Sequence, residues 1–132
     1  MERLFVDTSA WFAYANRKDP RHKIVSEALR NFSGRLVTSN FVFDEAISLS
    51  RYRLGHQAAR TIGSVLLDPN EVDVLRVTAN DERTAWELFC NRNDQRYSFT
   101  DCTSFSLMRR LGLNLALSLD EDFRAEGFAS IL

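Results

Sequence analysis

Four acidic side chains follow apolar segments of the chain or stand near the starts of helical ones. Asp7 follows the apolar run 4–6, Glu45 lies in the first turns of a helical pattern, Asp101 opens another, and Asp120 ends the run "LALSLD". If the apolar runs are neighbouring parallel strands, these four carboxylates meet at one edge of the sheet. A cluster of oxygen ligands selects hard divalent cations, so the set predicts a site for Mg²⁺ or Mn²⁺.

Electrostatic repulsion within such a cluster favours binding of a cation. Two carboxylates about 6 Å apart, at an effective dielectric constant near 20, repel by roughly 3 kcal/mol. The alternative is that Asp7, Asp101 and Asp120 are unrelated helix N-caps. Glu45 argues against that alternative for the set as a whole, because it lies inside its helical pattern and caps nothing.

Neighbouring acids leave the assignment open at two positions. Asp44 stands beside Glu45, and Asp122 lies two residues after Asp120. Helical and turn geometry points both of them away from the expected cluster, so they are alternates. Asp94, in the loop before Asp101, is a more remote one.

Other chemistries of α/β proteins lack their residues. No lysine follows Lys23, which excludes a phosphate-acceptor receiver domain, and Ser9 stands where a haloacid-dehalogenase-type phosphatase carries its second aspartate. No GxxxxGK or GxGxxG loop is present to bind a nucleotide. His22 and His56 lack partners for a catalytic triad, and His22 is expected on a solvated helix surface.

Composition predicts one globular domain over residues 1–132. Apolar residues make up 45% of the chain and charged residues 27%, which excludes disordered and low-complexity classes. No apolar run has the length of a membrane span, and the first residues lack a signal-peptide pattern, so we expect a cytoplasmic protein without a membrane partner. Cys90 and Cys102 lack metal-ligand spacing and are assigned no role.

Strand patterns alternate with helical patterns along the chain. This order predicts an α/β fold with a central parallel sheet of four to five strands and helices on both faces. The expected strands are 4–6, 34–39, 72–78, 115–120 and, weakly, 128–132; the expected helices are 8–16, 19–32, 40–54, 56–68, 80–93 and 100–112.

Capping residues mark the expected helix starts. Asp19 with Pro20 opens helix 19–32, Ser39 or Asn40 opens helix 40–54, and Asn80 or Asp81 opens helix 80–93. Gly55 closes helix 40–54. The buried stripe of helix 19–32 is expected to consist of Ile24, Val25, Ala28, Leu29 and Phe32.

Four segments in order resemble the PIN-domain ribonucleases, and closely the VapC-type toxins of VapBC toxin–antitoxin pairs. They are "DTSAW", "SNFVFDEAISL", "SFTDCTSFSLMRRLG" and "ALSLDEDFRAEGF", which together span the chain. The resemblance implies a three-layer PIN-like domain in which Asp7, Glu45, Asp101 and Asp120 bind the metal and carry catalysis. It also implies hydroxyl groups that support the acids, here Ser118 and either Thr8 or Ser9.

The resemblance further implies a metal-dependent endoribonuclease that leaves a 5′-phosphate and a 3′-hydroxyl, with Mg²⁺ or Mn²⁺ activating a water. Asp101 or Asp7 would orient that water. Expected partners are RNA, a cognate antitoxin and a second copy in a homodimer. The alternatives are a housekeeping RNA-processing nuclease without an antitoxin, and a binding module that does not cleave.

Arginines outnumber lysines strongly, which suits recognition of phosphate. Tyr14, Tyr52 or Tyr97 could stack on a splayed base, although aromatic residues at helical spacing usually belong to a core. The candidate RNA-binding residues are Arg51, Arg53, Arg92, Arg96, Arg109 and Arg110.

Overall fold

The computed structural model describes residues 1–132 as an α/β fold around one all-parallel sheet. The strand order is β3-β2-β1-β4-β5, so the first strand lies at the centre and pairs with β2 on one side and β4 on the other. The expected fold class is confirmed, with five strands. Their bounds are β1 Arg3–Val6, β2 Arg35–Ser39, β3 Val72–Leu75, β4 Leu115–Leu117 and β5 Ala129–Ser130.

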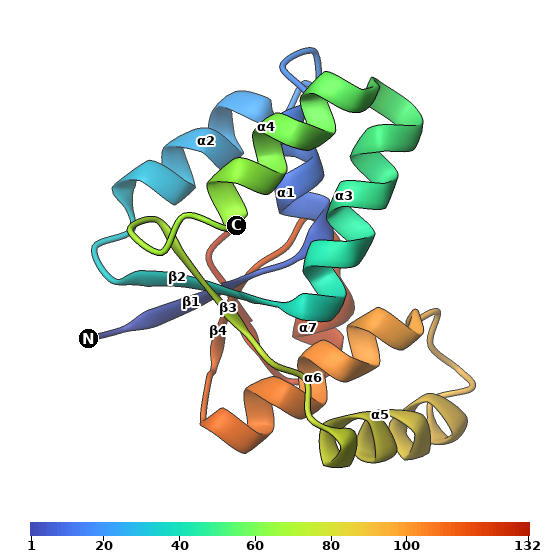
Figure 1. Ribbon diagram of the computed structural model, residues 1–132. Helices are drawn as coiled ribbons and strands as arrows, with labels where there is room; N and C mark the ends of the chain where they lie inside the picture. Colours follow the sequence, from blue (N-terminus) through green and yellow to red (C-terminus); the bar gives the residue numbers. More distant parts are fainter.

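Six of the seven helices cover the sheet in two groups, which gives the three layers. In Figure 1, α1 to α4 lie above the sheet, and α5 and α6 lie below it. The helices are α1 Thr8–Ala15, α2 His22–Asn31, α3 Asn40–Leu54, α4 His56–Leu66, α5 Ala79–Asn91, α6 Phe99–Leu111 and α7 Asp122–Ala125.

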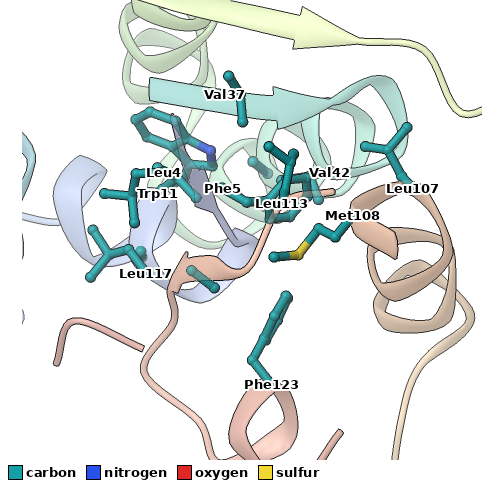
Figure 2. Close-up of a cluster of buried hydrophobic side chains, with 14 of the residues drawn as sticks. Leu4, Phe5, Trp11, Val37, Val42, Leu107, Met108, Leu113, Leu117 and Phe123 are labelled. Carbon is teal, nitrogen blue, oxygen red and sulfur yellow. The ribbon is translucent and has the colours of Figure 1, made fainter. Parts of the chain in front are cut away.

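The hydrophobic core fills the space between the central strands and the helices of both layers. Leu4, Phe5 and Val6 are completely buried, as expected for a central strand covered on both faces. In Figure 2, Phe123 of α7 points into the buried cluster beneath Met108 of α6. The core therefore fixes the strand that precedes Asp7 and also holds the short helix after Asp120.

Two helix starts differ from the expectation. Helix α2 begins at His22, because Asp19 accepts a hydrogen bond from the backbone N–H of Arg21 (2.8 Å) in a turn that precedes the helix. Ile24, expected in the buried stripe of α2, is 51% exposed. Helix α5 is capped by Thr78, so neither Asn80 nor Asp81 is its N-cap.

Helix α3 begins and ends where the sequence predicts, whereas β3 and β4 are shorter than expected and end at Leu75 and Leu117 instead of residues 78 and 120. Ser39 caps α3 by accepting a hydrogen bond from the backbone N–H of Val42 (3.0 Å). The helix ends at Leu54 and is followed by Gly55, whose φ of 101° few other residues adopt. The chain then continues directly into α4.

The sheet reverses its direction of growth between β1 and β4. The chain runs outward from β1 to β2 and β3, and later returns to add β4 and β5 on the opposite side. In open parallel sheets, ligands bind at such a switch point, in the crevice at the carboxyl ends of the strands. Asp7 leaves β1 at this point, where its backbone N–H donates to the carbonyl of Leu117 in β4 (3.0 Å).

Candidate active site

Asp7 occupies the N-cap position of α1, but its side chain caps nothing. The residue is 3% exposed, and its Oδ1 atom has no hydrogen-bond partner. Its Oδ2 atom accepts hydrogen bonds from the hydroxyls of Ser9 (3.1 Å) and Ser118 (3.1 Å). A buried carboxylate oxygen without a partner is costly. The capping alternative therefore fails for Asp7, and its carboxylate has a free oxygen for a ligand.

The serine hydroxyls link the first and fourth strands. Ser118 Oγ lies 3.1 Å from Asp7 Oδ2 and 3.2 Å from Asp120 Oδ1, so its one proton serves either carboxylate. Ser9 Oγ accepts from the backbone N–H of Leu119 (3.0 Å). The hydroxyl of Thr8 is buried without a partner, so of the two candidates it is Ser9 that contacts Asp7.

Asp101 occupies the third position of α6 and is held by a capping box. Its Oδ2 accepts from the backbone N–H of Ser98 (2.9 Å), and its own N–H donates to Ser98 Oγ (3.0 Å). Burial, followed by the charge of Asp7, raises the pKa of Asp101 to about 7. The capping box thus holds a carboxylate in an environment that disfavours its charge.

The other raised pKa values show that the aspartates form one electrostatic unit. Burial and then the charge of Asp120 raise the pKa of Asp7 to about 6. Burial and the charge of Asp120 also raise the pKa of Asp122, although a hydrogen bond with Asp101 opposes the shift. None of the ion pairs in the structure involves any of these four residues.

Buried carboxylates elsewhere in the protein have arginine partners. Asp81 pairs with Arg110 (2.8 Å), and Glu126 pairs with Arg92 (3.0 Å) and Arg109 (2.7 Å). The hydrogen bond from Arg110 lowers the pKa of Asp81. For Glu126, burial is the largest single effect and raises the pKa, but the hydrogen bonds and charges of Arg92 and Arg109 together lower it below its usual value. The cluster at the sheet edge therefore stands out as negative charge without a protein counterion.

Asp122 was expected to point away from the cluster, and this is wrong. It is half-buried at the start of α7, where it interacts with Asp101 and Asp120. Asp120 itself is exposed and lies three residues beyond the end of β4. Its Oδ1 accepts from the backbone N–H of Asp122 (3.2 Å), which links the two acids in one turn. This turn could have been inferred from the spacing "DED", in which the second aspartate follows closely enough to fold back.

Glu45 interacts less strongly with the cluster than the aspartates do. It is half-buried in α3, between the buried residues Val42 and Ala46, whereas Asp44 is exposed. The charge of Glu45 is not among the main causes of the raised aspartate pKa values. No three Asp, Glu, His or Cys side chains converge closely enough to enclose an ion as they stand.

The residues nevertheless fit a hard divalent cation in their donor chemistry. The site offers only carboxylate and hydroxyl oxygens, including the unpartnered Oδ1 of Asp7. The charges around it are all negative. A bound cation would satisfy that oxygen and relieve the repulsion, provided that the exposed Asp120 and the half-buried Glu45 turn inward.

Half of the candidate RNA-binding arginines are engaged in ion pairs. Arg92, Arg109 and Arg110 contact the buried carboxylates of Glu126 and Asp81. Sequence alone could not reveal these contacts, because the partners lie 17 to 34 residues away. Arg51, Arg53 and Arg96 are exposed and form no ion pair.

The candidate base-stacking residues differ in their exposure to solvent. Tyr97 is 6% exposed and packs edge-on against Phe105, so it belongs to the core. Tyr52 is 90% exposed. Tyr14 stacks on His22 at a centroid distance of 6.2 Å, and His22 Nδ1 lies 3.0 Å from the carbonyl oxygen of Ala13. His22 is therefore partly buried and bound to α1, contrary to the expectation of a solvated side chain.

None of the helices combines the length and the apolar character needed to cross a bilayer.

Comparison with known proteins identifies relatives over almost the whole chain. The family model described as "PIN domain" matches residues 4–128. The 23S rRNA-specific endonuclease VapC20 of Mycobacterium tuberculosis is 38% identical over 128 residues, which cover 97% of both chains. A VapC ribonuclease of Archaeoglobus fulgidus is 28% identical, over 89% of this chain and 77% of its own.

Solved structures agree with these sequence matches. The crystal structure of Mycobacterium tuberculosis VapC20, described as a sarcin-ricin loop cleaving toxin, superposes with a TM-score of 0.91 over 96% of both chains. The VapBC2 complex of Rickettsia felis, at 10% identity, covers 97% of this chain and 96% of its own with a TM-score of 0.70, which shows the shared fold alone. The protein therefore belongs to the PIN-domain family and, within it, to the VapC-type proteins.

Proposed function

We propose that the protein is a metal-dependent endoribonuclease that acts as the toxin of a toxin–antitoxin pair. The observation that carries this proposal is the cluster of Asp7, Asp101, Asp120 and Asp122, which lacks any cationic partner at the carboxyl edge of the sheet. A relative that is 38% identical over 97% of the chain is named as an endonuclease of 23S rRNA. The two findings support the same reaction class, which is hydrolysis of an RNA phosphodiester bond.

The proposed ligands of Mg²⁺ or Mn²⁺ are Asp7, Glu45, Asp101 and Asp120, with Asp122 as a further carboxylate in the same cluster. When bound, the ion supplies charge neutralisation at the phosphate and lowers the pKa of a water molecule. Asp44 is left out of the set because, unlike Asp120, its charge is not among the main causes of the raised pKa values of Asp7 and Asp101.

The protein residues position the reacting groups. Asp7 and Asp101 are the buried members of the cluster, and we assign them the orientation of the attacking water. Ser9 and Ser118 hold Asp7 Oδ2, which leaves its Oδ1 directed to a ligand. Exposed Arg51, Arg53 and Arg96 are the arginines available to hold the RNA backbone, since the other candidates are ion-paired.

The substrate and partner follow from the relatives. We propose 23S rRNA as the substrate, because VapC20 is named as specific for it. We also propose an antitoxin protein that blocks the acidic site. Formation of a homodimer, which the family resemblance implies, stays a prediction that light scattering tests.

The test is expression of the protein without a partner in a bacterial host. We expect growth arrest and new 5′-phosphate ends in 23S rRNA, mapped by ligation and sequencing. Asp101→Asn should abolish both effects, whereas Asp44→Asn, a matched change at an exposed acid, should leave them intact. Equal toxicity of folded Asp101→Asn at equal expression would contradict a catalytic cause.

A housekeeping nuclease is the second candidate for the same site. It would produce RNA ends without growth arrest, and no antitoxin gene would accompany its own. A binding module that does not cleave would produce neither new ends nor any dependence on Asp101.

A further inference from the structure

The segment after β4 carries the acids of the cluster that are least restrained by regular structure. Asp120 is exposed, and Asp122 opens α7, which consists of the four residues Asp122–Ala125. A single helical turn has no stability of its own in water. Repulsion within the cluster also pushes these acids apart. Something outside the segment must therefore hold it in place.

The first restraint is apolar. Phe123 is completely buried, and its ring packs against Phe5 of β1 and Phe105 of α6 at centroid distances of 6.2 and 4.9 Å. Figure 2 shows this side chain directed from α7 into the core. Burial of this ring fixes the depth of α7, and the buried ring of Phe128, which follows α7, packs against it at a centroid distance of 6.3 Å.

The second restraint is the ion-paired cluster of Glu126, Arg92 and Arg109. Arg92, the C-cap of α5, donates from Nε to Glu126 Oε1 (3.0 Å) and from Nη2 to Oε2 (3.3 Å). Arg109 of α6 donates from Nη2 to Oε2 (2.7 Å) and to the backbone carbonyl of Glu126 (2.8 Å). The guanidinium of Arg109 also lies 5.2 Å from the centre of the Phe128 ring.

Glu126 is linked directly to the acids through the backbone. Its N–H donates to the carbonyl of Asp122 (3.0 Å), and the N–H of Asp122 donates to Asp120 Oδ1 (3.2 Å). The contacts therefore run from two helices of the lower layer, through Glu126, to both acids of the segment. The Glu126 side chain is only 4% exposed, so water competes little for these contacts.

We propose that Glu126 is a positioning residue for the metal site, which it serves by fixing α7, and with it Asp120 and Asp122, against α5 and α6. The proposal rests on the proposed function. It gives the ion pairs of the buried Glu126 with Arg92 and Arg109 a role other than RNA contact. Its consequence is that neutralising Glu126 loosens two carboxylates without removing either from the chain.

The test is Mn²⁺ binding to purified protein in the absence of RNA, measured by titration calorimetry and by the shift in melting temperature. Glu126→Gln keeps the size of the side chain and removes its charge. We expect about a 10-fold weaker Kd for Mn²⁺, which is typical when a partner that orients metal ligands is removed. Arg92→Gln leaves the Arg109 contacts in place, and we expect a smaller loss in the same direction.

Asp81→Asn is the matched control. Asp81 is 2% exposed at its side chain and pairs with Arg110 of α6, so it also joins α5 to α6, but it makes no contact with the segment after β4. We expect it to lower the melting temperature and leave the Kd for Mn²⁺ unchanged.

The possible outcomes separate this proposal from the proposed function. If the wild type binds no Mn²⁺, the metal-dependent function itself fails. If the wild type binds Mn²⁺ and Glu126→Gln binds it equally well, or no worse than Asp81→Asn does, only the positioning role fails. If Glu126→Gln does not fold, the variant Arg92→Gln provides the test. Arg92 is 41% exposed at its side chain, and its replacement leaves the ion pair between Arg109 and Glu126 intact. An unchanged Kd for Mn²⁺ in Arg92→Gln overturns the proposal.

Discussion

At the scale of single residues, the site is defined by one carboxylate that the protein leaves incompletely bonded. Asp7 is buried beside other acids, and its Oδ1 atom has no hydrogen-bond partner. Its environment raises its pKa from 3.8 to about 6, so the charged form is disfavoured in the folded protein. The ionised carboxylate of Asp7 therefore lowers the stability of the folded protein, as is common for residues of functional sites.

Asp7→Asn should therefore stabilise the protein in chelator while abolishing cleavage. The raised pKa corresponds to about 3 kcal/mol of cost for the ionised form at neutral pH. Asparagine keeps one oxygen but adds an amide group that needs a partner, so we expect a gain of about 2 kcal/mol in the free energy of unfolding. Urea denaturation with chelator measures this gain. Addition of Mg²⁺ should stabilise the wild type and have little effect on the variant; equal stabilisation of both would remove Asp7 from the site.

The stability of the metal-free protein should also depend on pH in an unusual direction. Asp7 and Asp101 have folded pKa values of about 6 and about 7, above the 3.8 of the unfolded chain. The folded state thus binds more protons than the unfolded state between about pH 4 and pH 7, so stability falls as pH rises through this window.

Urea denaturation in chelator between pH 5 and pH 8 measures this dependence. The slope should weaken in the variant Asp7→Asn, which has one raised carboxyl group fewer. A stability that increases from pH 5 to pH 8 would contradict the environment described for these two acids.

At the scale of elements, two equivalent capping boxes have different roles. Ser98 and Asp101 start α6, and Thr78 and Asp81 start α5, with the same reciprocal hydrogen bonds. In α5 the acid is also paired with Arg110, whereas in α6 it faces other carboxylates. The same local motif therefore stabilises one helix and orients a site residue in the other.

Ser98→Ala and Thr78→Ala should each destabilise the protein by about 1 kcal/mol, the usual cost of losing an N-cap side chain. Only Ser98→Ala should also weaken binding of Mg²⁺, because it frees the N–H of Asp101 and loosens its carboxylate. Thermal melts with and without Mg²⁺ compare the two variants. The same loss of metal stabilisation in both would show that the capping box of α6 has no special role in the site.

Sequence patterns predicted the elements well because each carries its own local signal. The apolar runs, Ser39 and Gly55 placed β1, β2 and α3 nearly to the residue. The start of α5 was wrong because Asp81 reads equally well as a cap or as the third residue of a capping box. Local patterns could not distinguish these two readings.

The site was predicted less completely, because tertiary contacts decide it. Asp7 and Asp101 follow from their places at the carboxyl edge of a parallel sheet. The inward position of Asp122 depends on how α7 packs through Phe123. The pairing of Arg92 and Arg109 with Glu126 likewise depends on contacts between distant helices, which no periodicity reveals.

At the scale of the whole molecule, a net charge of −1 hides a separation of charges. The aspartates of the cluster have no arginine partner, while several arginines are committed to buried carboxylates elsewhere. This arrangement concentrates uncompensated negative charge at the switch point of the sheet. It suits a protein whose site is completed by a cation before an anionic substrate approaches.

The most direct test of this account is cleavage by the purified protein of a 23S rRNA fragment that contains the sarcin-ricin loop. We predict cleavage at a defined position with Mg²⁺ or Mn²⁺, no cleavage in excess chelator, and none by Asp7→Asn with either metal. Undiminished cleavage in excess chelator, or by folded Asp7→Asn, would contradict the claim that the acidic cluster acts through a bound cation.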